Sequence, residues 1–128
     1  MKTRFNTTEI LYLPLKAKWY ELIERLIKPE EYRGITAYWI VRLFRDEYGR
    51  KITKLTAKFL ESHLEILKWW VESGKLVFMP FDFVKFSYGY TKRTMTFMIK
   101  EIIIGKGNPE WGAPEEEVFI IKLSKRIK

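Results

Sequence analysis

The chain has 128 residues, a length typical of one domain that buries its own core. It has no cysteine, which excludes disulfides, thiolate metal sites and a cysteine nucleophile. Its single histidine argues against a histidine metal site, and we expect no metal or other cofactor. The net charge of +8 and the 16% aromatic content favour nucleic acid as partner, because Lys and Arg bind phosphates and aromatic rings stack on bases.

The sequence also bears on the location of the protein. No apolar stretch approaches the ~18 residues that a membrane-spanning helix needs. The N-terminal residues lack the apolar run of a signal peptide. We therefore expect a soluble, cytoplasmic protein that does not bind membranes.

In the first half of the chain, the hydrophobic pattern predicts one strand and three helices. The apolar run of residues 10–15 is typical of a strand. Apolar residues then recur at helical spacing in three segments. These segments cover residues 16–28, 35–49 and 53–74. Pro29 is expected to end the first helix and Gly49 the second, and residues 30–33 between them form a short extended segment. The buried stripe of the first helix consists of Trp19, Leu22, Ile23, Leu26 and Ile27.

From residue 75 onward, the pattern changes to the period of strands. Four segments are expected to be strands. They cover residues 75–80, 81–90, 94–105 and 117–127. Because helices come mainly first and strands mainly last, the layout is α+β in a single domain, residues 1–128. We expect the strands to curl into a small barrel with the helices packed at its ends.

Two blocks of the sequence resemble ASCH-domain proteins of the PUA-like superfamily, of the small type common in phages and mobile elements. The first is "LPLKAKWYELIERLIKPEEYRGITAYWI", and the second runs from "VKFSYGY" to "IGKGNPEWGAPEEEVFIIKL". The resemblance implies a PUA-like β-barrel with a cleft, and RNA or nucleotide ligands. Residues of about 51–76, with a helix at about 53–73, have no counterpart in that pattern and are expected to form an insertion.

The charged residues around the extended segment are the central candidates for a site. Side chains alternate along an extended chain, so Glu31 and Arg33 are expected to face one side and Tyr32 the other, with Lys28 close by. The family pattern is a Gly-x-Lys turn followed by Glu-x-Arg, and by resemblance Lys28 and Arg33 take the lysine and arginine positions. Here "RLI" replaces the glycine turn. Two interpretations stay open: a nucleotide-binding cleft, or a structural ion pair at a barrel edge.

Other residues are candidates for nucleic-acid binding because cations and aromatic rings are interleaved along the chain. They are Lys16, Lys18, Tyr38, Arg42, Tyr90, Asn108 and Trp111. Each has a simpler interpretation, since lysines and helix faces are commonly just solvated. The loop of residues 105–116 either forms a base-reading pocket or folds back to plug the barrel.

Two further functions compete with binding. Some ASCH proteins resemble amidohydrolases acting on N4-acylated cytidine through a Lys, a Thr and a Glu, which by resemblance makes Lys28 and Glu31 catalytic candidates, with Glu101 as a distant carboxylate. Glu31 stands at the threonine position, which argues against that hydrolysis; a ribonuclease is a related alternative. A third possibility is a protein partner held by Trp69 and Trp70.

Overall fold

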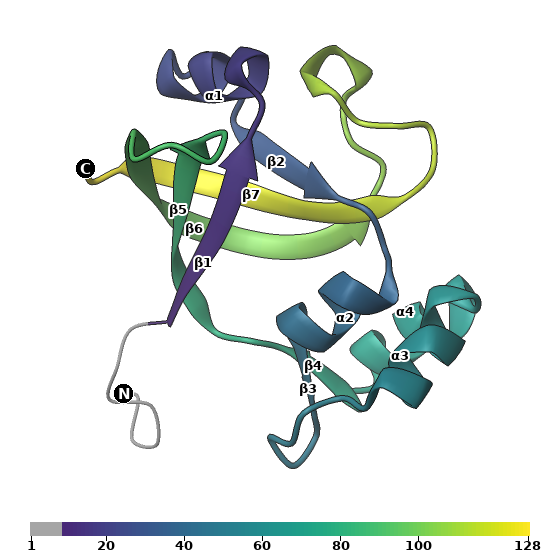
Figure 1. The fold of residues 1–128 in the computed structure, drawn as a ribbon. Helices are drawn as coiled ribbons and strands as arrows, with labels where there is room; N and C mark the ends of the chain where they lie inside the picture. Colours follow the sequence, from purple (N-terminus) through teal and green to yellow (C-terminus); the bar gives the residue numbers. More distant parts are fainter. Residues whose placement is uncertain (1–8) are drawn as a thin grey trace.

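The structure, a computed structural model, describes residues 9–128, which form a curled five-stranded sheet, a two-stranded sheet and four α-helices (Figure 1). The elements are, in chain order, β1 (Glu9–Leu15), α1 (Ala17–Glu24), β2 (Glu30–Arg33), α2 (Ala37–Leu43), β3 (Phe44–Asp46), α3 (Lys54–Glu61), α4 (Leu64–Glu72), β4 (Leu76–Phe78), β5 (Phe81–Tyr88), β6 (Thr94–Gly105), the 3₁₀ turn η1 (Pro109–Trp111) and β7 (Val118–Arg126). The predicted α+β class is confirmed. No helix among these residues is both long and apolar enough to span a bilayer. The N-terminal stretch considered for a signal peptide lies largely outside the described residues.

The large sheet has the strand order β1-β5-β6-β7-β2. β1 runs parallel to β5, and the other neighbours are antiparallel. The sheet curls into a half-barrel, so its two edge strands, β1 and β2, approach each other without pairing (Figure 1). We call the gap between these two edge strands the seam. The side chain of Arg33 on β2 crosses it, with Nη2 donating to the carbonyl oxygen of Pro14 on β1 at 3.0 Å.

The concave face of the half-barrel holds the hydrophobic core. Alternate residues of each strand point inward, as the period of two requires. The buried residues that the five-stranded sheet contributes to this core are Leu11, Leu13 and Leu15 on β1, Val84 and Phe86 on β5, Met95 and Phe97 on β6, and Phe119 and Ile121 on β7. Helix α1 lies at one end of the curl and α2, α3 and α4 lie at the other (Figure 1). Residues from all four helices join the same core.

The helix predicted over residues 53–74 is two helices, so this prediction is wrong. α3 ends before Ser62, and α4 begins after His63. The His63 ring stacks on Phe59 with centroids 4.2 Å apart, and its Nδ1 lies 2.7 Å from the Phe59 carbonyl oxygen. The His63 side chain thus contacts the Phe59 carbonyl oxygen, which would accept a backbone hydrogen bond if the helix continued, and the chain changes direction at this point.

The helix predicted over residues 35–49 is also too long. α2 ends at Leu43, and Phe44 adopts an extended conformation with φ −123° and ψ 157°. This change lets Phe44 lie fully buried, pair with Phe78 across β3 and β4, and pack on Phe119. Packing therefore overrides the helical period. Gly49, expected to end the helix, instead lies in the turn after β3.

The first helix ends at Glu24, four residues before Lys28, the last residue of the predicted helix. Leu26 is left-handed, with φ 63°, and is the only non-glycine residue with positive φ among those described. The Leu26 and Ile27 N–H groups donate to the Ile23 and Leu22 carbonyls, which is the Schellman ending of a helix. As a consequence, Leu26 and Ile27 are exposed and do not join the predicted buried stripe.

Leu26→Gly is expected to stabilise the protein by about 0.5–1 kcal/mol, because glycine adopts the left-handed conformation without the clash of a Cβ. The leucine side chain is 72% exposed, so little buried surface is lost. Urea denaturation of the two proteins measures the difference. Leu26→Ala keeps a Cβ and serves as the control. A gain in stability in that variant, or none in Leu26→Gly, contradicts the explanation.

Candidate functional site

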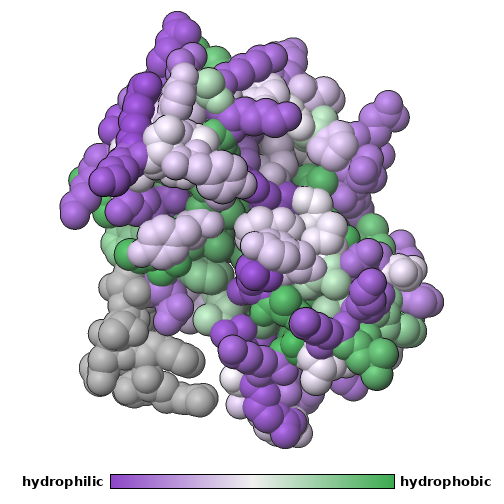
Figure 2. All heavy atoms as spheres, in the orientation of Figure 1, coloured by the Kyte–Doolittle hydropathy of each residue, from purple (hydrophilic) through white to green (hydrophobic). Residues whose placement is uncertain are grey.

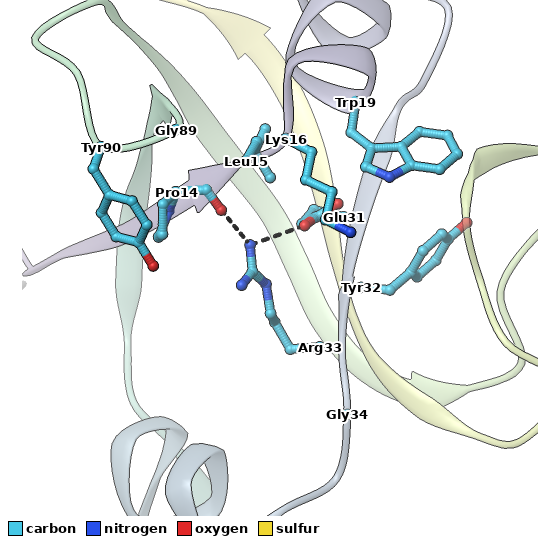
Figure 3. A pocket seen from close by; sticks show the side chains of 10 residues that line it. All are labelled: Pro14, Leu15, Lys16, Trp19, Glu31, Tyr32, Arg33, Gly34, Gly89 and Tyr90. Carbon is cyan, nitrogen blue, oxygen red and sulfur yellow. Dashed lines mark hydrogen bonds and ion pairs between the residues drawn. The ribbon is translucent and has the colours of Figure 1, made fainter.

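A pocket of about 490 Å³ opens at the seam of the half-barrel, and we call it the seam pocket. β1, the start of α1, β2 and the turn after β5 all contribute to it (Figure 3). Its lining residues are Pro14, Leu15, Lys16, Trp19, Glu31, Tyr32, Arg33, Gly34, Gly89 and Tyr90. The pocket exists because β1 and β2 approach each other without hydrogen-bonding as neighbours.

Arg33 and Glu31 form the inner wall of the seam pocket. Arg33 Nη2 lies 3.0 Å from both Glu31 Oε2 and the Pro14 carbonyl oxygen. The two side chains point to the same side of β2, and Tyr32 points away from them (Figure 3). The alternation predicted for the extended segment is confirmed. Arg33 Nε is buried and has no hydrogen-bond partner among the described residues, so this guanidinium is incompletely satisfied.

Lys28 converges on the same carboxylate but lies behind the seam pocket. Its side chain is 1% exposed, and its Nζ lies 3.1 Å from Glu31 Oε1. The Nζ also donates to the Trp111 carbonyl oxygen at 2.7 Å and faces the rings of Trp19 and Tyr32 at 5.3 and 4.5 Å. Burial lowers the pKa of Lys28, and the neighbouring Glu31 carboxylate opposes that shift. Lys28, Glu31 and Arg33 thus form a cluster of ion pairs at the barrel edge, and Glu31 and Arg33 of this cluster also form one wall of the pocket.

The mouth of the seam pocket carries a cation and two aromatic rings. Lys16 is exposed at the residue before α1, and Tyr90 is 96% exposed in the turn that follows β5. Trp19 is half-buried on α1 and faces the pocket from the side opposite Tyr90 (Figure 3). Lys18 does not line the pocket, and its Nζ lies over the Trp19 ring, 4.7 Å from the centroid.

The loop of residues 106–117 packs on the convex face of β2 and β7, so it does not plug the barrel. Tyr32, Trp111 and Ile120 belong to a small cluster there, separate from the main core. The N–H of Asn108 donates to the Tyr32 hydroxyl at 3.0 Å, and the Asn108 side chain accepts from the N–H of Glu110 at 2.9 Å. Asn108 and Trp111 therefore fix the loop, and neither lines the seam pocket.

A bond within β2 fixes Tyr32, whose hydroxyl the loop contacts, and one contact of the loop itself supports the pocket. The Tyr32 hydroxyl donates to Glu30 at 2.6 Å, and burial together with this bond raises the pKa of Tyr32. Gly112, with φ 95°, packs against Trp19 so closely that a Cβ there would lie 2.8 Å from the indole. The loop therefore sets the position of Trp19, which forms one wall of the pocket.

Glu101 lies on the opposite face of the sheet from Glu31. Glu101 is opposite Lys122 on β7, and Lys122 is opposite Glu30 on β2. Partners across a sheet share a face and neighbours along a strand alternate, so Glu101 shares the face of Glu30. Its carboxylate lies 3.8 Å from Lys122 Nζ. Glu101 is not part of the Lys28–Glu31–Arg33 cluster.

The remaining candidates lie away from the seam pocket. Tyr38 and Arg42 line a different groove, between α2 and α3. Trp69 is exposed on α4, and Trp70 is half-buried with Lys75 Nζ 4.9 Å from its ring centroid. Among residues 9–128, no three His, Asp or Glu side chains are grouped so as to hold a metal ion.

Sequence reasoning missed two parts of the site. Trp19 follows the helical period of the core stripe, so the sequence pattern alone does not distinguish it from a core residue. Its role becomes clear only from the position of the loop of residues 106–117. The Pro14 carbonyl oxygen has no signature in a sequence at all. No protein-family model, curated protein or solved structure matches this chain. The family resemblance stays a hypothesis, and the geometry of the seam pocket carries the functional conclusion.

Proposed function

We propose that the seam pocket binds a nucleotide unit of single-stranded nucleic acid, with RNA as the preferred form. The observation that carries the proposal is the composition of one pocket: Arg33 and Glu31 on its inner wall, and Lys16, Trp19 and Tyr90 at its mouth. Cations for phosphate, rings for stacking and a carboxylate for hydrogen bonding are the groups that single-stranded recognition requires.

Each group has a distinct task in this proposal. Lys16, exposed at the mouth, meets a backbone phosphate. The exposed ring of Tyr90 stacks on a base. Glu31 is held by Lys28 and Arg33, and it accepts a hydrogen bond from a base amino group or a ribose hydroxyl.

We further propose that the chain is an ASCH domain with the PUA-like fold. The half-barrel supports this assignment, and so does the backbone at Leu26. That residue occupies the glycine position of the Gly-x-Lys turn, and its φ of 63° belongs to the left-handed region that favours glycine. Lys28, Glu31 and Arg33 also form one bonded cluster, as a shared motif requires.

The geometry favours binding over hydrolysis of a modified nucleoside. Lys28 Nζ is directed at Glu31 and at the Trp111 carbonyl and does not line the seam pocket. The residues that do line it include no serine, threonine, cysteine or histidine. The lining therefore supplies no aliphatic hydroxyl, thiol or imidazole for the threonine-type chemistry of that reaction.

Binding is tested by fluorescence anisotropy of labelled single-stranded RNA and DNA oligonucleotides of about eight nucleotides at increasing salt. We expect RNA to bind at low salt and affinity to fall as salt rises. Tyr90→Ala is expected to weaken RNA binding about tenfold by removing a stacking ring. Tyr48→Ala, which removes another exposed tyrosine far from the pocket, is expected to change nothing. No binding at low salt, or equal losses in the two variants, contradicts the proposal.

A further inference from the structure

A second concave surface lies between α2 and α3, and we call it the α2–α3 groove. Its volume is about 620 Å³, which is larger than the seam pocket. It is lined by Ala37, Tyr38, Val41 and Arg42 of α2 and by Lys54, Leu55 and Lys58 of α3. None of these residues lines the seam pocket, so the groove is a separate feature.

Two of the apolar side chains of this groove are exposed, and Ala37 and Val41 are half-buried beside them. Leu55 is 84% exposed and Tyr38 is 55% exposed. α3 already buries Ala57 and Leu60 in the core, so Leu55 gives this short helix an apolar residue on a second face. Hydrophobic residues surrounded by hydrophilic ones are visible at the surface around α2 and α3 (Figure 2). Exposed apolar residues lining a concave surface and rimmed by polar ones are typical of an interaction site.

The charged residues that line the groove are all cationic. Arg42, Lys54 and Lys58 line it, and no Asp or Glu does. None of these three cations forms an ion pair with a carboxylate in residues 9–128. Arg42 lies over the Tyr38 ring, with Cζ 3.4 Å from the centroid. Glu61, also on α3, accepts a bond from the N–H of Ala37 and lines a different pocket.

We propose that the α2–α3 groove is the docking site for an acidic amphipathic helix of a partner protein. Apolar side chains of that helix would cover Val41, Leu55 and the Tyr38 ring, and its carboxylates would pair with Lys54 and Lys58. Aliphatic side chains such as Val41 and Leu55 gain by burial against other apolar groups and offer no flat surface for a base, and Arg42 already lies over the Tyr38 ring. The apolar floor therefore favours a peptide over nucleic acid, and the cations require that peptide to be acidic.

The proposal is tested with a displayed library of helical peptides selected against the whole protein. We expect the enriched sequences to carry apolar residues at i, i+3, i+4 and i+7 and an excess of Asp and Glu. A synthetic peptide of the most enriched sequence is then titrated by fluorescence anisotropy. Leu55→Ser and Lys58→Glu are expected to weaken its binding by about tenfold or more. Trp69→Ser and Lys125→Glu, exposed changes outside the groove, are expected to leave binding within about twofold.

Several results would overturn the proposal. One is a selection that enriches neutral or basic peptides, or that succeeds equally on the Leu55→Ser protein. Another is loss of peptide binding in Trp69→Ser, which would place the partner on α4. If Lys58→Glu instead weakens RNA binding, the groove belongs to a nucleic-acid interface. If sedimentation shows a dimer that Leu55→Ser dissociates, the occupant is a second copy of the chain.

Discussion

Replacing Lys28 by Met is expected to lower the free energy of unfolding by about 2–4 kcal/mol. Lys28 Nζ is the hydrogen-bond donor to the Trp111 carbonyl oxygen and a partner of Glu31, and its side chain is almost completely buried. Methionine fills a similar volume but leaves that carbonyl without its donor and Glu31 with Arg33 as its remaining cation. The loss of stability therefore measures the polar contacts rather than a cavity.

The same substitution is expected to loosen the loop of residues 106–117. This loop contains four glutamates, so cleavage by a glutamate-specific protease reports its opening. We expect faster cleavage in Lys28→Met at urea concentrations well below the unfolding transition. Lys125→Met, which changes an exposed lysine on β7, is the matched control and is expected to behave as wild type. Unchanged stability and unchanged cleavage in Lys28→Met would show that Lys28 does not hold the loop.

Replacing Arg33 by Lys is expected to reduce RNA affinity by about tenfold, and Arg33→Ala by about a hundredfold or more. The guanidinium contacts the Pro14 carbonyl and Glu31 together, so it sets the width of the seam pocket and directs the carboxylate at the same time. A lysine keeps the charge, but it ends in a flexible ammonium instead of the rigid planar guanidinium whose Nη2 contacts both acceptors, so it holds them less firmly. The graded loss follows from that difference in geometry.

The measurement for Arg33 is anisotropy with the same RNA, accompanied by urea denaturation to show that each variant is folded. Arg50→Ala removes another arginine that is paired with a carboxylate, Asp46, at an exposed turn. This control is expected to bind RNA as wild type does. Equal affinity of wild type and Arg33→Lys would mean that charge alone matters and that the bridge across the seam has no part in binding.

Strands were more predictable than helix ends in this chain, for physical reasons. Period-two and continuous apolar runs bounded by turns locate β1 and β5 to β7, and Pro29 followed by charged residues locates β2. The ends of α1, α2 and α3 lack the usual glycine or proline signal. A leucine rather than a glycine terminates α1, and no glycine or proline marks the break at Ser62 and His63. Phe44 leaves the helix for a packing reason that local sequence does not contain.

The candidate site was predictable only where local geometry decides it. Alternation along two residues of β2 places Glu31 beside Arg33. The burial of Lys28 depends on Trp111, 83 residues away in the chain, so no local pattern reports it. The same holds for Trp19, whose position depends on Gly112. Tyr38 and Arg42 share a helix face, but the fold places that face at a different groove.

The most direct test of the central claim, that the seam pocket holds a nucleotide, is cross-linking of 4-thiouridine-labelled RNA to the protein, with the linked residues mapped by mass spectrometry. We expect cross-links at Trp19 or Tyr90, the two rings at the mouth of the pocket, and we expect Arg33→Ala to abolish them. Cross-links confined to α2 and α3, or cross-links that persist in Arg33→Ala, would contradict it.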